Sequence, residues 1–231
     1  MAKFIVIDGL DGCGKATQVK CVADYLTKNN YTVHTMSFPA YNSESSALVK
    51  MYLNGDFGAD ATKINPYVCS SFYAVDRFAQ FYTKYFKYFE ENDNTIILSD
   101  RYISANIIHQ ASKLIDTDDK HKFIEWAYKY ECDLCKLPKE DATILLTIPP
   151  IVSQSLLNNR YDGDTSKKDI HENSLSYLQT CYTQLNDSVN FINTNHIANW
   201  RWIDCSTADK KSIKPINEIT SILIEELKSI I

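Results

Sequence analysis

The sequence predicts an α/β protein in which a five-stranded parallel sheet is flanked by helices in three layers. Short apolar runs of strand length recur along the chain, and longer segments with apolar residues at helical spacing separate them. This alternation is typical of a doubly wound parallel sheet. The first run also passes directly into a glycine-rich turn, as expected where such a strand meets its helix. The expected strands are Phe4–Ile7, Thr32–Ser37, Thr95–Ser99, Thr143–Ile148 and Trp200–Cys205.

Six long helices are expected between and after these strands, and proline or polar residues open several of them. The Trp200-Arg201-Trp202 segment is expected to form an edge strand. In a sheet of this class, ligands bind beyond the carboxyl ends of the strands, so residues that follow each strand have most weight. The expected helices are Lys15–Asn29, Pro66–Asn92, Lys120–Glu131, Ile151–Asn159, Glu172–Asn193 and Pro215–Ser229.

Composition limits the class of protein. A chain of 231 residues with 45% hydrophobic content can bury one large core, so we expect a single domain over residues 1–231. The net charge of −5 argues against a polynucleotide partner, which requires clustered cations. No apolar run approaches the roughly 20 residues of a membrane span, and seven scattered cysteines suggest reduced thiols. We therefore expect a cytoplasmic protein with no membrane partner.

The turn after the first strand has the spacing of a phosphate-binding loop. Gly9 and the Gly14-Lys15 pair match the Walker A pattern, in which backbone N–H groups surround phosphate oxygens and the lysine neutralises them. The dipole of the following helix adds attraction for an anion. The sequence therefore predicts a nucleotide site, with ATP held by Gly9, Asp11, Gly12, Cys13, Gly14, Lys15, Ala16 and Thr17.

One position in this loop departs from the pattern. Ala16 stands where a hydroxyl usually ligates magnesium, so either Thr17 or water is expected to replace that ligand. Cys13 lies at a helix N-terminus, where a thiolate is favoured, but we interpret it as a small loop residue rather than a nucleophile.

Polar and aromatic residues follow the second and third strands. Phe38-Pro39 comes after the second strand and Asp100-Arg101-Tyr102 after the third, so both should face the phosphate loop. A carboxylate there can hold Mg²⁺ directly or through water, and an arginine can bind a phosphate with two parallel hydrogen bonds. The alternative interpretation is a surface ion pair.

A second Asp-Arg dipeptide lies inside a predicted helix. Arg77 is one helical turn beyond Tyr73, so an aromatic ring and a cation share one face. Such a face suits a planar base. In the alternative interpretation, Tyr73 belongs to the core and Arg77 is solvated.

Together these segments resemble the thymidylate kinase family, from Phe4 to about Tyr182. The last motif of the resemblance is Leu137-Pro138 followed by Asp141 before a strand. The segments around Asn65-Pro66-Tyr67 and Asp169–Glu172 look most like the Firmicutes-type bacterial branch. The resemblance implies the nucleoside monophosphate kinase fold with its phosphate loop, and transfer of the γ-phosphoryl group of ATP to dTMP, giving dTDP, with Mg²⁺.

The resemblance also assigns roles on the phosphate side of the site. Lys15 would hold ATP phosphates, and Asp11 would correspond to the carboxylate that approaches the 3′-hydroxyl of dTMP. Arg101 would hold the dTMP phosphate, while Asp100 would help to position Mg²⁺.

On the base side, Arg77 would hydrogen-bond a thymine carbonyl, and Tyr73 aligns with the stacking aromatic, with Phe72 as its alternative. Asn106 matches an amide that reads thymine N3 and O4. His109 would lie near the sugar 2′ position. Phe38 and Pro39 complete the implied substrate contacts.

Phosphoryl transfer needs cations around the transferred oxygens, and a lid usually supplies them. The polar segment at about residues 160–171 lies between two predicted helices and contains Gly163, as a mobile lid would. Some members of the family carry an arginine in the phosphate loop, but Gly12 and Cys13 occupy that region here. Arg160 is therefore the candidate catalytic cation.

Other functions stay open. A deoxynucleoside kinase or a kinase for a different monophosphate would use the same scaffold, and a nucleotide-binding regulatory protein would bind without transfer. A nucleoside kinase would need a carboxylate base over the 5′-hydroxyl. The family also implies a homodimer, and an aromatic-rich run fits an interface or a monomer core equally well. Its members are Phe78, Phe81, Tyr82, Tyr85, Phe86, Tyr88 and Phe89.

Overall fold

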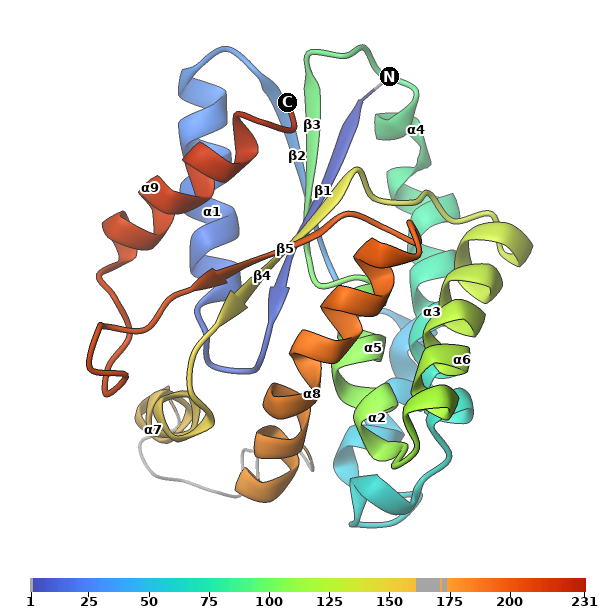
Figure 1. Cartoon of the computed structure of the whole chain (residues 1–231). Coiled ribbons are helices and arrows are strands. Elements are labelled where there is room, and N and C mark those ends of the chain that lie inside the picture. Colours follow the sequence, from blue (N-terminus) through green and yellow to red (C-terminus); the bar gives the residue numbers. More distant parts are fainter. Residues whose placement is uncertain (1, 161–170, 172–173) are drawn as a thin grey trace.

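In a computed structural model, residues 2–160, 171 and 174–231 are described, and within them five strands form one parallel sheet (Figure 1). The strand order is β2-β3-β1-β4-β5, so the chain starts in the middle of the sheet and builds outward on both sides. This confirms the expected fold class and the edge position of the last strand. The strands are β1 (Lys3–Gly9), β2 (Thr32–Ser37), β3 (Thr95–Asp100), β4 (Ala142–Thr147) and β5 (Trp200–Asp204).

Helices cover both faces of this sheet (Figure 1). The helices α1 (Lys15–Lys28) and α9 (Ile216–Leu227) pack together on one face. On the other face, α5 (Ile103–Gln110) packs on β1 and α8 (Leu175–Thr194) packs on β5, while α3 (Pro66–Gln80) and α6 (Thr117–Tyr128) both pack against α5. The helix α7 (Pro150–Arg160) follows the carboxyl end of β4. The carboxyl ends of the strands, where the sequence predicted the site, therefore lie among α2 (Ala47–Asn54), α5, α7 and the start of α1.

Successive side chains of the central strand β1 point to opposite faces of the sheet and pack in two separate hydrophobic cores. Phe4 and Val6 pack in the cluster that holds α5, α6 and α8, whereas Ile5 and Ile7 pack in the cluster that holds α1 and α9. All four side chains are almost fully buried. A strand buried on both faces is typical of a parallel sheet between two helix layers.

Two short helices near the site, α2 and α5, are not among the six long helices expected from the sequence. The helix α2 (Ala47–Asn54) and the helix α5 each have eight residues, too few for apolar spacing to stand out from the sequence around them. The single long helix expected over Pro66–Asn92 is instead α3, a π-helical segment over Phe81–Tyr85, and the short α4 (Phe86–Phe89). A second π-helical segment, Lys129–Leu134, follows α6.

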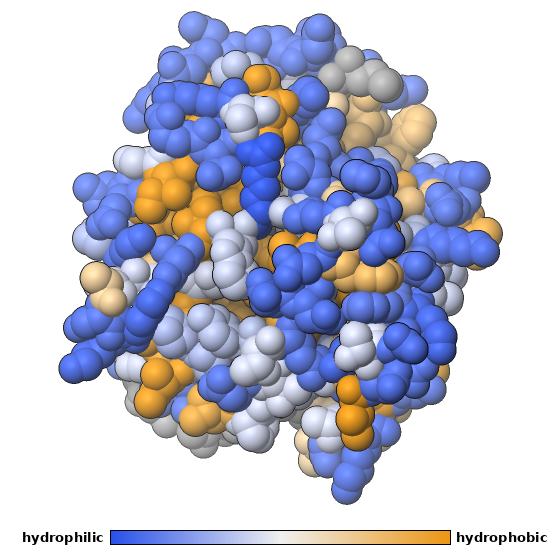
Figure 2. Space-filling view, in the orientation of Figure 1, coloured by the Kyte–Doolittle hydropathy of each residue, from blue (hydrophilic) through white to orange (hydrophobic). Residues whose placement is uncertain are grey.

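The surface is largely hydrophilic in the orientation of Figure 2, with separate apolar patches. In the described part of the chain, no helix combines the length and apolar character needed to cross a lipid bilayer. The seven cysteines are free thiols, as expected, including the Cys132 and Cys135 pair.

Candidate active site

The phosphate loop connects β1 to α1, and its first glycine is required by close packing. Gly9 has a φ of +141°, and a Cβ there would lie 2.1 Å from the backbone oxygen of Leu146 in β4. The Lys15 Nζ atom donates to the backbone oxygens of Gly9 and Leu10, at 2.9 Å each. The lysine is therefore held inside the loop, at the N-terminus of α1, where a phosphate can replace these carbonyl partners.

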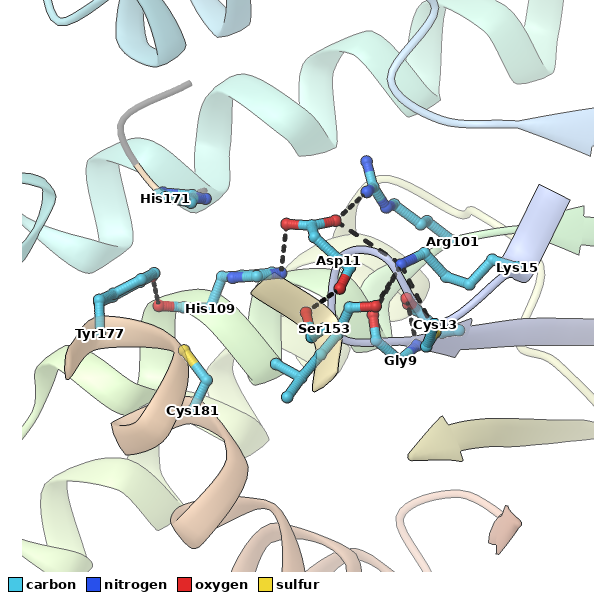
Figure 3. A network of polar contacts seen from close by, with 12 residues as sticks. Gly9, Asp11, Cys13, Lys15, Arg101, His109, Ser153, His171, Tyr177 and Cys181 are labelled. Carbon is cyan, nitrogen blue, oxygen red and sulfur yellow. Dashed lines mark hydrogen bonds and ion pairs between the residues drawn. The ribbon is translucent and has the colours of Figure 1, made fainter. Parts of the chain in front are cut away.

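The helix α7 packs directly on this loop. The Ser153 hydroxyl donates to the backbone oxygen of Asp11 (Figure 3), and a Cβ at Gly12 would lie 2.9 Å from the backbone oxygen of Ser153. Because α7 fills this space, position 12 has no room for a long side chain. Cys13 is fully buried in the core, and burial raises the pKa of its thiol, which agrees with a packing role.

Asp8 connects the phosphate loop to α5, a role that the sequence did not indicate. Its Oδ1 accepts from the backbone N–H of Gly9 at 2.8 Å, and its Oδ2 accepts from the Ser104 hydroxyl at 2.5 Å. Burial raises the pKa of this carboxyl, although the Lys15 ammonium opposes that shift.

Asp11 lies at the centre of the charged groups (Figure 3). Its carboxylate forms an ion pair with Arg101, lies 3.6 Å from Lys15 Nζ, and lies 3.9 Å from His109 Nε2. Burial opposes ionisation of Asp11, but Arg101 and then Lys15 outweigh it and hold its pKa well below the usual range. Asp11 is therefore an anion that lies between the side chains of Arg101 and Lys15.

The backbone of Arg101 is held in the left-handed region, with a φ of +66°. Such a conformation costs about 1–3 kcal/mol for a residue other than glycine. Two bonds fix it: the backbone N–H of Arg101 donates to Ile7, and the Ser99 hydroxyl donates to the Arg101 backbone oxygen at 2.7 Å. This turn places the guanidinium against Asp11 rather than along the sheet edge.

Two cavities adjoin at Asp11 and Arg101. The first, the donor cavity, contains about 650 Å³ of empty volume and is lined by the phosphate loop, the end of β3 and the end of α7. The second, the acceptor cavity, contains about 440 Å³ and is lined mainly by α3 and α5. The residues common to both are Asp11, Phe38, Pro39, Tyr41 and Arg101.

Most of the predicted site residues line one of these cavities. The donor cavity includes Gly12, Gly14, Lys15, Ala16, Thr17, Asp100 and Arg160. The acceptor cavity includes Tyr73, Arg77, Asn106 and His109. Three predicted residues do not line them: Gly9 contacts Lys15 through its backbone, Cys13 is in the core, and Phe72 packs against Phe57. Apart from residues 160 and 171, the predicted lid lies outside the described residues.

Arg77 is buried rather than solvated, with 1% of its surface exposed. Its Nε and Nη2 atoms donate to the two carboxylate oxygens of Glu131, at 2.6 Å each. The neighbouring Asp76 binds the loop after Phe38-Pro39 through the backbone N–H of Ala40 and the hydroxyl of Ser45. The two residues of the dipeptide therefore have different surroundings. Asp76 holds the loop after Phe38-Pro39, and Arg77 lines the acceptor cavity.

The sequence missed several residues of the acceptor cavity, of which two carry chemical groups in unusual surroundings. Gln110 is buried, and its Oε1 atom has no hydrogen-bond partner in the described structure. His171 stacks on His109 with ring centroids 5.0 Å apart, and its Nε2 lies 2.7 Å from the Tyr52 hydroxyl. The position of Gln110 beside His109 was an available signal. The missed residues are Tyr41, Leu53, Ala105, Gln110 and His171.

Thr17 and Asp100 line the donor cavity together and offer the hydroxyl and carboxylate oxygens that Mg²⁺ prefers. The described residues contain no group of three or more histidine, cysteine or acidic side chains arranged to hold a metal. Mg²⁺ commonly uses one or two protein carboxylates and fills its other positions with water and substrate phosphates. The residues present therefore fit an ion that is held mostly by a nucleotide.

Comparison with known proteins assigns the family. The sequence model of thymidylate kinase matches residues 7–199. The chain belongs to the thymidylate kinase family. The matched range runs from β1 to the residue before β5 and so includes every described residue that lines either cavity. The expectation of a kinase of this family is thereby confirmed.

Relatives in this family span a wide range of organisms. A protein of Methanococcus maripaludis named "Probable thymidylate kinase" is 26% identical over 231 residues, which cover all of both chains. The thymidylate kinase of Mycobacterium tuberculosis is 28% identical over 146 residues, or 63% of this chain and 65% of that one. A solved thymidylate kinase from Candida albicans has a TM-score of 0.64 at 18% identity, covering 99% and 92% of the two chains, and supports the fold.

Proposed function

We propose that this member of the thymidylate kinase family transfers the γ-phosphoryl group of ATP to dTMP, with Mg²⁺, to give dTDP. The observation that carries the proposal is the junction of two cavities at Asp11 and Arg101. The phosphate-binding loop borders the donor cavity, and the Arg101–Asp11 ion pair borders both cavities. A transferring phosphoryl group needs donor and acceptor in line across such a junction.

The chemistry of the acceptor cavity fits thymine. Arg77 supplies N–H donors, while Asn106 and the unpartnered Gln110 Oε1 supply amide oxygens. The Watson–Crick edge of thymine presents two carbonyls on either side of the N3–H group, so donors and acceptors of both kinds are needed. Tyr73 adds an aromatic ring in the same cavity.

On the donor side, Lys15 and the N-terminus of α1 would bind the ATP phosphates, and Thr17 with Asp100 would hold Mg²⁺. When bound, the ion would neutralise the oxygens of the donor phosphates. Arg101 would bind the acceptor phosphate with two parallel hydrogen bonds, and its ion pair with Asp11 would limit the movement of its guanidinium. Arg160, at the end of α7, lines the donor cavity and would add a further cation there.

Asp11 argues against a nucleoside kinase. Such an enzyme needs a carboxylate base that can take the proton of a 5′-hydroxyl. The pKa of Asp11 is held well below its usual range by Arg101 and Lys15, so this carboxylate is a weak base. A monophosphate acceptor needs no such base at Asp11, because it brings its own anionic oxygen. A kinase for another monophosphate and a binding protein without transfer stay as the alternatives.

A panel of acceptors tests the proposal. ADP release from ATP and Mg²⁺ is measured with dTMP, dUMP, dCMP, dGMP, AMP or thymidine at equal concentration. We expect rapid turnover with dTMP and little with dCMP, dGMP or AMP. Turnover with thymidine in place of dTMP would identify a nucleoside kinase. ADP release from none of the acceptors would support the regulatory protein.

We also propose a homodimer, because part of the aromatic-rich run is exposed on the surface of the monomer while the rest is buried. Phe81 and Tyr85 are buried in the monomer core, whereas Phe78, Tyr82 and Phe86 are each more than two-fifths exposed. The rings of Phe78 and Tyr82 contact each other, with centroids 4.7 Å apart, and those of Tyr82 and Phe86 stack at 6.1 Å. A contiguous aromatic surface of this kind is typical of an interface. A solution mass near 26.5 kDa, that of one chain, would contradict the dimer.

A cytoplasmic location and the Firmicutes-type branch also belong to the proposal. The free thiols of all seven cysteines support a reducing compartment. The segments around Asn65-Pro66-Tyr67 and Asp169–Glu172 support the branch, whereas the two sequence relatives named above are archaeal and mycobacterial.

A further inference from the structure

We infer that Glu131, which does not line the acceptor cavity in the described structure, is a positioning residue that determines which base the cavity accepts. The inference rests on the proposed function and adds the origin of its base specificity. Glu131 is fully buried and contacts both Arg77 and Asn106, the two residues expected to read the base.

The first contact fixes Arg77. Two of its guanidinium nitrogens, Nε and Nη2, are used by the carboxylate of Glu131 at 2.6 Å each. A bidentate pair of this geometry in a dry environment holds the plane of the guanidinium in one orientation. Three N–H groups remain, two on Nη1 and one on Nη2, with which Arg77, a residue that lines the cavity, can donate to a ligand. The guanidinium can donate but never accept.

The second contact fixes the direction of the Asn106 amide. Its Nδ2 atom donates to Glu131 Oε1 at 3.2 Å and to the backbone oxygen of Ser70 at 3.3 Å. Both partners are acceptors, so a flipped amide would place its oxygen against two other oxygens. Asn106 therefore meets a ligand through Oδ1, which can only accept a hydrogen bond.

These two fixed directions distinguish pyrimidines that share a shape. In thymine, N3 carries a hydrogen for Asn106 Oδ1, and the C4 carbonyl accepts from Arg77. In cytosine, N3 presents a lone pair and C4 carries an amino group, so both contacts become repulsive. Uracil presents the same edge as thymine. Because Glu131 fixes both side chains, we expect the cavity to prefer a base with a protonated N3 over cytosine. The preference comes from favourable contacts with the first base and from unfavourable contacts with cytosine.

The local backbone accounts for the position of this carboxylate. Glu131 lies in the π-helical segment Lys129–Leu134 that follows α6, and the backbone N–H of Leu137 donates to its carbonyl at 3.0 Å. One residue inserted in a helix rotates the following side chains by about 100°. Such π-helical segments occur often at functional sites, where they aim a side chain.

The substitution Glu131→Gln tests the inference because the side chain keeps its size, but one of its two hydrogen-bond-accepting oxygens becomes an NH₂ donor. Both oxygens of Glu131 accept from Arg77, so the glutamine NH₂ group faces an Arg77 N–H in either orientation, and at the Oε1 position it also faces Asn106 Nδ2. The variant therefore loosens Arg77 in both orientations, and in one of them it also removes the Glu131 contact that fixes the Asn106 amide. We expect the ratio of kcat/KM for dTMP to that for dCMP to fall by about tenfold or more. Most of the change should be a higher KM for dTMP. The matched control is Glu140→Gln, another buried carboxyl, which should keep the wild-type ratio because Glu140 contacts Tyr128 and Thr143 instead.

A merely structural role predicts a different result. If Glu131→Gln lowers kcat/KM for dTMP and dCMP by the same factor, or leaves both unchanged, the inference is wrong. If that variant does not fold, Glu131→Asp decides the question. Aspartate keeps two acceptor oxygens, so its dTMP preference should stay within about threefold of the wild-type ratio. A lost preference in Glu131→Asp would contradict the inference.

Calorimetric binding of dTMP and dCMP separates this inference from the proposed function. If the wild type binds dTMP in preference and Glu131→Gln loses that preference, the inference holds even if no phosphoryl transfer occurs. Equal binding of dTMP and dCMP by the wild type would contradict it, whatever the enzyme transfers.

Discussion

The Asp11 carboxylate and the Arg101 guanidinium form an ion pair where the donor and acceptor cavities meet. The two residues come from different loops, one after β1 and one after β3, which are neighbouring strands of the parallel sheet. Asp11 also pairs with Lys15, so a single anion contacts two of the cations that line the cavities. The predictions that follow concern these groups and the elements that hold them.

Arg101→Ala should lower kcat/KM for dTMP by about a hundredfold or more, because a cation aimed at the acceptor phosphate is lost. Arg101→Lys should recover only part of this activity, since lysine lacks the two-pronged geometry. Steady-state kinetics with varied dTMP measure both. Arg201→Ala, which removes an arginine that contacts Glu226 and Ser229, is the control and should behave as wild type. An Arg101→Ala enzyme within about threefold of wild type would exclude this role.

Arg160→Ala should lower kcat much more than it raises KM for either substrate. The reason is that a cation which acts on the transferring oxygens stabilises the transition state more than the bound substrates. The residue lines the donor cavity from the end of α7. Equal kcat in this variant and in wild type, measured at saturating ATP and dTMP, would remove Arg160 from the mechanism.

Gly12→Ala should destabilise the protein by about 1–3 kcal/mol and also lower kcat. Its Cβ would lie 2.9 Å from the Ser153 backbone oxygen, and its φ of +80° disfavours any side chain. The helix α7, which carries Arg160, must then move. Gly58→Ala is a suitable control, since Gly58 also has a positive φ but a Cβ there meets nothing within 4 Å. Urea unfolding and kinetics of both variants are compared. Similar losses of kcat in the two would show that backbone strain, and not α7 packing, is responsible.

Acid should destabilise the protein through the buried histidine stack. Burial lowers the pKa of His109 from 6.5 to about 4 and lowers that of His171 well below its usual value. Between these values the unfolded chain binds protons that the folded chain does not, so stability falls as pH drops from about 6.5 to 4. For His109 alone the loss at pH 5 is about 2 kcal/mol. Urea unfolding at pH 7.5, 6 and 5 should show a shallower decline in His109→Gln. An unchanged decline would contradict the assignment.

The sequence predicted the sheet and the donor cavity well because their signals are local. An apolar run, a glycine-rich turn and a helix start occupy consecutive positions from Phe4 to Thr17, and the chemistry follows from that spacing. The loop after β3 was predicted for the same reason, since parallel strands end at one edge of the sheet.

The acceptor cavity was predicted less completely because its contacts join distant segments. Arg77 and Glu131 are separated by 54 positions, and nothing in the sequence around either residue indicates the pair. Glu131 also lies in a π-helical segment, where the regular helical period fails to predict which way a side chain points. His171 and Gln110 were missed for a related reason: burial beside a cavity is a property of the packed structure.

The most direct test of the central claim is to follow the label from [γ-³²P]ATP with Mg²⁺ and dTMP, and to separate the products by chromatography. If the donor and acceptor cavities meet at Asp11 and Arg101 as described, the label should move from ATP into dTDP. Transfer should be much slower with dCMP as acceptor, and much slower to dTMP in Arg101→Ala. Label that is found only in inorganic phosphate, or that stays in ATP, would contradict phosphoryl transfer across this junction.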